Sequence, residues 1–146
     1  MKRSVLAPAL MLLAACTSAA QAATSEMFRD PNCGCCGLWA EHVRRTSEVV
    51  VSETVTNEMA QIKLANGVPR DLWSCHTMII EGYVIEGHVP AEQIERLLKE
   101  RPEGVRGLAV PGMPIGSPGM EMGNRTQPYE VIAFGENTRE VFARYN

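Results

Sequence analysis

The stretch Asn32-Cys33-Gly34-Cys35-Cys36-Gly37 places three thiols within four residues, the densest group of cysteines in the chain. Residues 38–45, which follow directly, contain no helix breaker and predict a helix. The cysteines would then lie at a helix N-terminus, where unpaired N–H groups and the positive end of the helix dipole stabilise a thiolate. A thiolate is both a nucleophile and a metal ligand, so the stretch predicts a chemically active site.

Two chemistries fit the spacing of these cysteines. Cys33 and Cys36 form a C-x-x-C pair, which is typical of thioredoxin-like redox proteins. Cys35 adds a third sulfur that a dithiol enzyme does not need and that favours a soft metal ion. A disulfide that only staples the loop is the structural alternative in an exported protein. It is less favoured, because the adjacent cysteines cannot form independent staples and one thiol would stay reactive.

Residues 1–22 have the features of a secretory signal. Lys2 and Arg3 precede an apolar run that is too short to span a bilayer and ends in small residues. Two processing alternatives are open. The stretch 13–16, Leu-Ala-Ala-Cys, resembles a bacterial lipobox that would lipidate Cys16, and Ala-Gln-Ala at 20–22 offers an ordinary cleavage site. We expect export from the cytoplasm, with the lipobox slightly favoured and membrane contact only through a lipid on Cys16.

Size and charge limit what the mature chain can be. The residues after the signal, roughly 120 to 130, make one compact domain with a hydrophobic core. A formal net charge of −3 gives no basic surface, so nothing favours a nucleic-acid partner. Four cysteines outside the signal are too few for a disulfide-dense scaffold, and three of them are clustered. They indicate a site.

Hydrophobic periodicity and turn residues predict an α/β protein. The expected elements are a strand at 26–29, the cysteine helix ending near Thr46, a strand at 48–52, a helix from 56 to about 65, a hairpin at 77–81 and 83–86, and a helix at 90–100. This β-α-β-α-β-β-α order is that of a thioredoxin-like domain, placed at 23–104. Residues 105–146 form a Gly/Pro/Met-rich C-terminal extension, packed on the same domain, that ends in a β-hairpin of 129–134 and 139–145.

The extension carries unusual methionines. Residues 107–123 are so rich in Gly and Pro that we expect neither helix nor central strand, yet they hold three of the eight methionines, Met113, Met120 and Met122. Methionine can serve as a flexible core filler, but its thioether is also a soft ligand for Cu(I). Met120 and Met122 would point to opposite sides of an extended loop, so we expect one to coordinate and the other to pack.

A second thiol, Cys75, stands beside His76 just before the predicted hairpin. In a thioredoxin-like fold this junction lies next to the first helix N-terminus, so both side chains could approach the three clustered cysteines. The ordinary alternatives are a buried apolar cysteine and a surface histidine. His88, before the last helix, becomes a candidate only if the fold brings it near the thiols. His42, inside the cysteine helix, is predicted to be solvated.

Several motifs occur in the order of a known family, and they cover nearly all of the mature chain. They are Cys-Gly-Cys-Cys-Gly at 33–37, Gly-Val-Pro at 67–69, Ser-Cys-His-Thr at 74–77, residues 82–90, residues 107–114 and residues 116–121. With them the sequence resembles the CxCC-motif family of the bacterial periplasmic copper-resistance protein CopG. The resemblance implies a thioredoxin-like domain and an extension that helps hold a multinuclear, thiolate-bridged copper cluster in the periplasm.

By the same resemblance, the cluster thiolates would be Cys33, Cys35, Cys36 and Cys75. Further ligands would be His76, His88 and a methionine of the extension. The implied role is interconversion of Cu(I) and Cu(II) in copper resistance, by a monomer whose partners are copper ions and periplasmic copper-export components.

Three functions of different classes stay open. The first is a copper oxidoreductase, and the second is a Cu(I) buffer or chaperone that does not turn over. The third is a thiol-disulfide oxidoreductase using Cys33 and Cys36, which leaves Cys35, Cys75 and the methionines unexplained. A structural zinc site is disfavoured because methionine is a poor zinc ligand.

Overall fold

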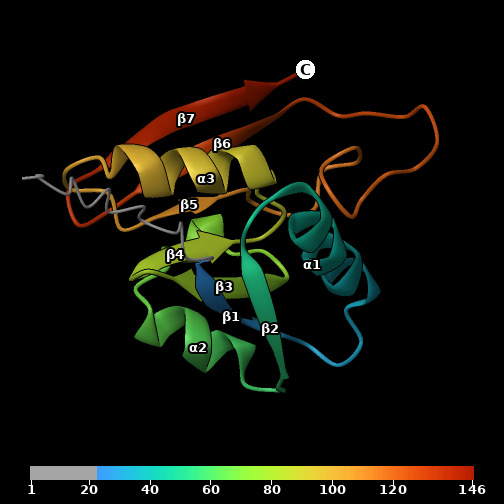
Figure 1. Cartoon of the computed structure of the whole chain (residues 1–146), viewed down its shortest axis with the longest axis horizontal. Helices are drawn as coiled ribbons and strands as arrows, with labels where there is room; N and C mark the ends of the chain where they lie inside the picture. Colours follow the sequence, from blue (N-terminus) through green and yellow to red (C-terminus); the bar gives the residue numbers. More distant parts are fainter. Residues whose placement is uncertain (1–22) are drawn as a thin grey trace, which may run out of the picture.

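The computed structural model describes residues 23–146, which form one mixed α/β unit around a seven-stranded sheet (Figure 1). The strands are β1 (Thr24–Arg29), β2 (Val50–Val55), β3 (His76–Ile80), β4 (Tyr83–Glu86), β5 (Gly107–Ala109), β6 (Tyr129–Phe134) and β7 (Arg139–Tyr145). The helices are α1 (Gly34–Thr46), α2 (Met59–Ala65) and α3 (Ala91–Glu100), with a 3-10 turn η1 (Arg70–Leu72). The predicted signal at 1–22 lies outside the described residues. Among the helices described, none is long and apolar enough to cross a membrane.

The strands lie in the order β2-β1-β3-β4-β5-β6-β7. β1 and β2 are parallel, β3 is antiparallel to β1, and β4 is antiparallel to β3. β5 joins β4 in parallel, and β6 and β7 follow as an antiparallel pair across a turn at 135–138. The predicted element order from the first strand to α3 is confirmed, with bounds shifted by a few residues.

The prediction that residues 107–123 contain no central strand is wrong. Gly107–Ala109 forms β5 between β4 and β6, and its three residues are buried. A Cβ atom on Gly107 would collide with the carbonyl oxygen of Val84 on β4, so only glycine allows this approach of the two strands. Tertiary pairing therefore overrides the low strand propensity of glycine, and the strand stops before Pro111.

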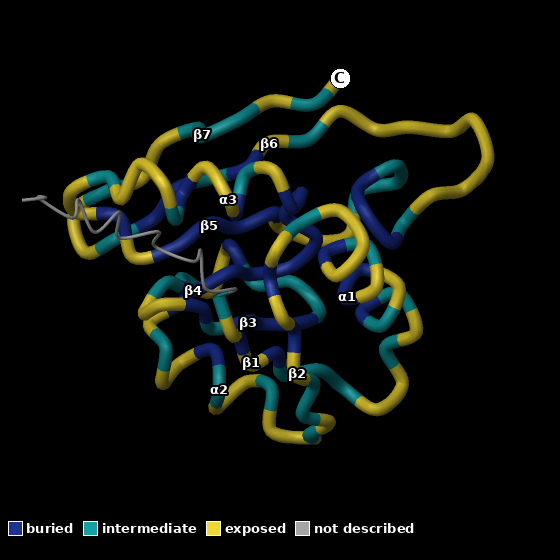
Figure 2. The backbone as a smooth tube through the Cα atoms, viewed as in Figure 1, coloured by how far each residue is buried: buried dark blue, intermediate teal, exposed yellow. Residues whose placement is uncertain are grey.

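Side chains on neighbouring positions of the strands point to opposite faces of the sheet, and each face has its own core. On one face, Met78, Ile85 and Leu108 pack with residues of α1 and α3, including Trp39 and Ile94. The other face carries a smaller cluster of residues: Val68, Leu72, Val84, Ala109 and Phe134. Figure 2 shows the buried central strands and the exposed segment 121–128 that swings away from them.

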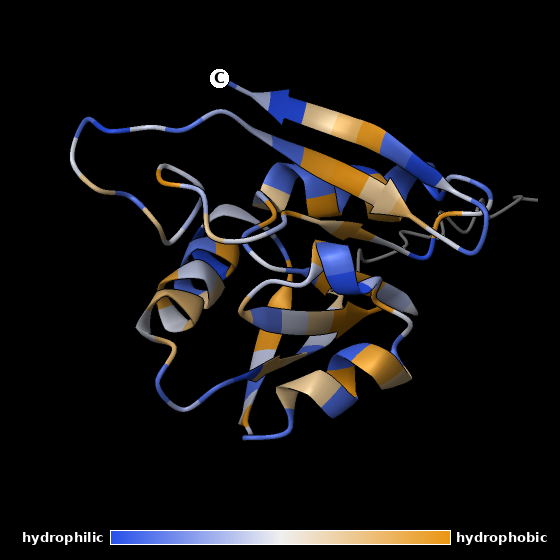
Figure 3. Cartoon of the chain, turned by 180° about the vertical axis from the view of Figure 1, so that it is seen from behind, coloured by the Kyte–Doolittle hydropathy of each residue, from blue (hydrophilic) through white to orange (hydrophobic). Residues whose placement is uncertain are grey.

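The last two strands form one edge of the sheet, with β7 outermost. β6 buries Val131 and Ala133, whereas no residue of β7 is fully buried, and both strands mix hydrophobic and hydrophilic side chains (Figure 3). The rings of Tyr129 and Tyr145 stack with their centroids 4.8 Å apart. This pair anchors the C-terminal end of the segment 110–128 that returns from β5.

Candidate metal centre

The cysteine motif is held by a turn between β1 and α1. Oδ1 of Asp30 accepts a hydrogen bond from the Asn32 N–H over 2.8 Å, and the Asp30 carbonyl accepts one from the Cys33 N–H over 3.1 Å. Cys33 is the N-cap residue of α1, so Cys35 and Cys36 lie in the first turn of that helix. The predicted placement of the cysteines at a helix N-terminus is confirmed.

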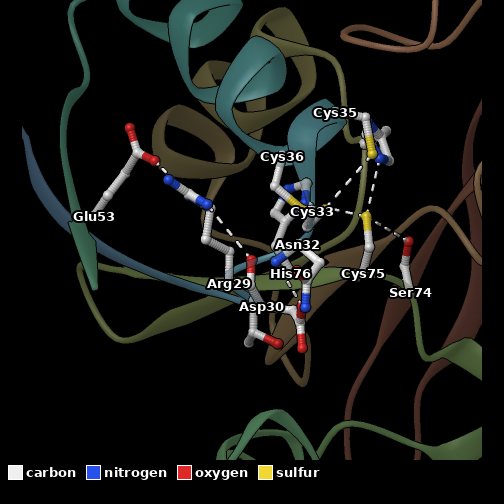
Figure 4. Close-up of a disulfide and its surroundings, with 12 residues drawn as sticks. Arg29, Asp30, Asn32, Cys33, Cys35, Cys36, Glu53, Ser74, Cys75 and His76 are labelled. Carbon is white, nitrogen blue, oxygen red and sulfur yellow. Dashed lines mark hydrogen bonds and ion pairs between the residues drawn. A yellow bond between two sulfur atoms is a disulfide. The ribbon is translucent and has the colours of Figure 1, made fainter. Parts of the chain in front are cut away.

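Cys33 and Cys36 form a disulfide, with their Cα atoms 5.4 Å apart (Figure 4). Cys35 is a free thiol whose Sγ atom lies 3.6 Å from Sγ of Cys33. Cys36 is completely buried, and the other two cysteines are half-buried. Since a disulfide sulfur has no ionisable thiol, Cys33 and Cys36 can become thiolate ligands only after reduction by two electrons.

Cys75 reaches the same cluster from the other side of the turn. In the antiparallel pairing of β1 and β3, His76 lies opposite Arg29, so the start of β3 faces the end of β1. Cys75 directly precedes β3 and is a free thiol. The Sγ atoms of Cys33, Cys35, Cys36 and Cys75 all lie within 4.8 Å of one another. The sheet register thus brings together the four cysteines that the sequence singled out.

Two buried histidines flank Cys75. Nε2 of His88 lies 3.0 Å from the Cys75 Sγ atom, and Nδ1 of His76 lies 3.5 Å from it. The two imidazoles meet edge to face, with centroids 5.1 Å apart, and neither is exposed to solvent. Cys75, His76 and His88 therefore form a second potential metal-binding group, which shares Cys75 with the four-sulfur group.

The extension fixes the orientation of His88. Its Nδ1 atom lies 2.8 Å from the Pro118 carbonyl oxygen, which can only accept, so Nδ1 carries the proton. In the neutral imidazole, Nε2 then presents its lone pair toward Cys75. Next to Pro118, Gly119 packs on α1. A Cβ atom at Gly119 would lie 2.7 Å from the backbone nitrogen of Trp39 and 2.9 Å from the Cys35 carbonyl oxygen.

His76 packs against Trp39 of α1, with ring centroids 4.3 Å apart. The indole of Trp39 is held in turn by a hydrogen bond of 2.8 Å from its Nε1 to the Val89 carbonyl. Nε2 of His76 is buried without a hydrogen-bond partner among the described residues. A buried polar atom of this kind is unusual, and coordination to a metal ion is one way to satisfy it. Sequence patterns did not single out Trp39, although it lies one helical turn after Cys36.

Burial controls the protonation of these groups. It raises the pKa of Cys75 to about 12, assisted by the neighbouring Cys35 thiol, while a hydrogen bond from Ser74 acts in the opposite direction. Burial also lowers the pKa of His76 well below its usual value, and the effect is increased by the repulsion between a protonated His76 and the cationic forms of His88 and Lys63. The pKa of His88 is lowered by burial, against the opposing influence of the Pro118 carbonyl and Glu121. Both imidazoles are neutral at pH 7, which is the form that binds metal, whereas Cys75 must release a proton to do so.

The candidate methionines lie in different environments. Met113 and Met122 are 51% and 46% exposed, and Met122 Sδ is 3.7 Å from the Arg125 guanidinium. Met120 is half-buried, and its N–H donates to the Ser117 carbonyl beside Pro118. Met120 is thus the methionine tied to the part of the extension that contacts His88.

The prediction that His42 is solvated is wrong for its Nε2 atom, which is buried and has no hydrogen-bond partner among the described residues.

Sequence patterns also missed a buried ion pair beneath the site. Lys63 of α2 lies with its Nζ atom 2.5 Å from Oε1 of Glu86 at the end of β4, and both side chains are almost completely buried. Glu86 stands two residues before His88. A lysine in a short helix and a glutamate at a strand end carry no local signal that they will meet.

Comparisons with known proteins show similarity in both sequence and fold. Residues 72–120 match the family described as "Protein of unknown function, DUF411". A search of curated proteins gives no match. A solved structure titled "Copper resistance protein copG- Form 2" is 39% identical, with a TM-score of 0.81, over 86% of this chain and 100% of that one. A second, "Copper resistance protein copG- Form 1", is 40% identical, with a TM-score of 0.80, over 86% and 98% of the two chains.

Proposed function

This chain belongs to the family of the copper resistance protein CopG, and on that premise we propose that it binds several copper ions at its four-cysteine cluster and interconverts Cu(I) and Cu(II). The observation that carries the proposal is the convergence of four Sγ atoms, from two separate segments, within 4.8 Å of one another. Sulfur is the donor that Cu(I) prefers. A bridging thiolate serves two metal ions, so four cysteines can hold more ions than terminal ligands would allow.

The donor set also suits a change of oxidation state. His76 and His88 add imidazole nitrogen to the sulfur donors, and both are neutral because burial lowers their pKa values. Imidazole suits copper in general, whereas thiolate and thioether favour Cu(I). Among the methionines, we propose Met120 as the thioether ligand of the cluster. We propose that Met113 and Met122, which are exposed, bind copper ions only at the protein surface.

The Cys33–Cys36 disulfide sets the order of events in this proposal. The bond must accept two electrons and two protons to yield two thiols, and each thiol must then lose a proton to bind copper. The described disulfide form offers Cys35 and Cys75 as its two free thiols. We therefore propose that the reduced protein is the form that holds the multinuclear cluster.

We further infer a thioredoxin-like domain over 23–104, with 105–146 as an extension that completes the metal centre. The strand order β2-β1-β3-β4 and the placement of the cysteines at the start of α1 support this inference. We propose periplasmic action as a monomer, with copper-export components as partners. The intact mass of the mature chain would decide between a lipid on Cys16 and a free N-terminus near Ala23.

The first test is copper analysis of the purified, reduced mature protein, followed by cycling between ascorbate and air under optical detection. Several coppers per chain with a reversible colour change are expected. Binding without reversible oxidation would instead indicate a Cu(I) buffer or chaperone, and no copper binding at all would contradict the proposal. Cys35→Ser should lose most of the bound copper.

One observation favours a second function, thiol-disulfide exchange. The disulfide joins Cys33 and Cys36 in a C-x-x-C pair at the start of α1, as in dithiol enzymes. Cys35→Ser separates the two functions, because it removes a copper ligand but leaves this pair intact. Exchange with a disulfide substrate that survives in Cys35→Ser, in a protein that binds no copper, would favour the dithiol function.

A further inference from the structure

Lys63, Thr77 and Glu86 form a closed polar network inside the protein. Nζ of Lys63 donates to Oε1 of Glu86 over 2.5 Å and to Oγ1 of Thr77 over 3.0 Å. Thr77 in turn donates to Oε2 of Glu86 over 2.7 Å. Lys63 is 3% exposed, and the other two residues are not exposed at all.

This network lies on the face of the sheet opposite Trp39. His76 contacts Trp39 of α1, and because side chains alternate along a strand, Thr77 points to the other face, toward α2. The network therefore lies behind the metal centre, on the opposite face of the sheet, and supplies none of its donor atoms.

Stability alone does not explain such a pair. Removing two charges from water costs several kcal/mol per ion, and well-packed apolar residues of the same volume are often equally stable or more so. A buried ion pair thus calls for a second reason, and the fourth hydrogen bond of the network supplies one.

Oε1 of Glu86 also accepts a hydrogen bond of 2.6 Å from the backbone N–H of Ser74, the residue before Cys75. Ser74 is restrained from two other sides. Its hydroxyl donates to the Gly112 carbonyl. Its side chain also occupies the space in which a Cβ atom on Gly87 would lie, and Gly87 has a positive φ of 71°. The turn that delivers Cys75 is therefore fixed by contacts that lie outside the metal centre.

We propose that Glu86, through the hydrogen bond that it accepts from the Ser74 N–H, is a positioning residue that fixes the Ser74-Cys75 turn, so that the Cys75 thiol faces both His88 and the other three cysteines. Glu86 is also close to His88 along the chain, because it is the last residue of β4 and Gly87 and His88 follow it directly. The Gly87 N–H donates to the His76 carbonyl over 3.0 Å, and this hydrogen bond joins the segment that carries His88 to the segment that carries Cys75. As this role serves copper binding at Cys75, it rests on the function proposed above.

Two double variants separate positioning from mere folding. Lys63→Met/Glu86→Gln removes both charges but keeps an amide oxygen that can accept from Ser74 and an amide N–H that can donate to Thr77. Lys63→Met/Glu86→Leu has a similar volume and no buried charge, but it cannot accept the Ser74 hydrogen bond. The glutamine variant is thus the matched control for the leucine variant.

The first readout needs no copper. In the metal-free disulfide form, Cys35 and Cys75 are the free thiols among residues 23–146. The rate of iodoacetamide modification of Cys75, relative to Cys35, is followed by peptide mass mapping. We expect the ratio in the glutamine variant to match the wild type, and the ratio in the leucine variant to rise several-fold because the turn is released.

The second readout is Cu(I) affinity of the reduced proteins, measured by competition with a chromogenic chelator. Outer-shell partners of metal ligands commonly change metal affinity 10- to 100-fold. We expect a loss of about tenfold or more in the leucine variant and rescue in the glutamine variant. If the leucine variant does not fold, Lys63→Met/Glu86→Met takes its place, since methionine adapts to irregular space.

Equal alkylation ratios in all three proteins would overturn the positioning role. The alkylation ratio could rise in the leucine variant while the wild-type protein binds no copper. That pair of results would support the positioning role and contradict the copper function. A glutamine variant that behaves like the leucine variant would also overturn the proposal, because the charge rather than the acceptor would then matter.

Discussion

The carbonyl oxygen of Pro118 accepts a hydrogen bond of 2.8 Å from Nδ1 of His88, and by doing so it turns the free Nε2 atom of His88 toward Cys75. Pro118 lies in the extension, and His88 lies between β4 and α3. A backbone group far along the chain thus decides which nitrogen of the histidine is available to a metal ion. Partners of this kind hold most metal-binding histidines in place.

His88→Asn tests the ligand role of His88 with little disturbance. The asparagine amide can still donate to the Pro118 carbonyl, but it has no atom in the place of Nε2. We expect Cu(I) affinity to fall by about tenfold or more, measured by chelator competition, with an unchanged far-ultraviolet circular dichroism spectrum. His42→Asn is the control on α1. Wild-type affinity in His88→Asn would contradict the ligand role.

Gly119→Ala tests whether the extension must approach α1 closely. Its Cβ atom would collide with backbone atoms of Trp39 and Cys35 at 2.7 and 2.9 Å, and Gly119 has a positive φ of 80°. We expect lower Cu(I) affinity and a loss of stability in urea unfolding that exceeds the roughly 1–2 kcal/mol of left-handed strain. Gly123→Ala is a matched control, because Gly123 also has a positive φ, 61°, but no atom near its Cβ position. Equal effects of the two substitutions would show that the contact with α1 is unimportant.

Acid should destabilise the metal-free protein through His76. Its folded-state pKa is far below that of the unfolded chain, about 6.5, so the unfolded state binds the additional proton. The contribution of His76 to stability is therefore complete above pH 6.5 and is lost as the pH falls below it, by up to about 1.4 kcal/mol per pH unit. The free energy of unfolding, measured in urea between pH 7.5 and 5.5, should decrease more steeply with falling pH for the wild type than for His76→Phe, which keeps an aromatic ring against Trp39. Parallel slopes would contradict this origin.

Copper capacity should depend on the state of the Cys33–Cys36 bond. Because disulfide sulfurs cannot be thiolates, we expect the reduced protein to hold more copper per chain than the oxidised protein. Metal analysis after gel filtration, with the thiols counted on the same sample, measures this difference. Cys33→Ser/Cys36→Ser should hold the lower amount in either state. The same copper content with and without reduction would show that these two cysteines are not ligands.

Local sequence determined much of the fold up to α3. A breaker-free run after the cysteines, β-branched residues within 48–52, and a proline that opens the run 90–100 with apolar side chains at helical spacing each indicate their element locally, although β2 and α3 begin at 50 and 91. The motifs also identified the family, and the placement of Cys35 and Cys36 at the start of α1 followed from chain order alone. These features depend on neighbours within a few residues, which is why the sequence reveals them.

Only the tertiary structure decided the rest. Gly107–Ala109 became a central strand because β4 and β6 flank it, and Lys63 met Glu86 because α2 packs against β3, next to β4. The register of β1 with β3 brought Cys75 to the other cysteines, and the return of the extension brought Pro118 to His88. Each of these contacts joins segments whose approach is set by sheet register and packing, and a local sequence pattern carries no information about either.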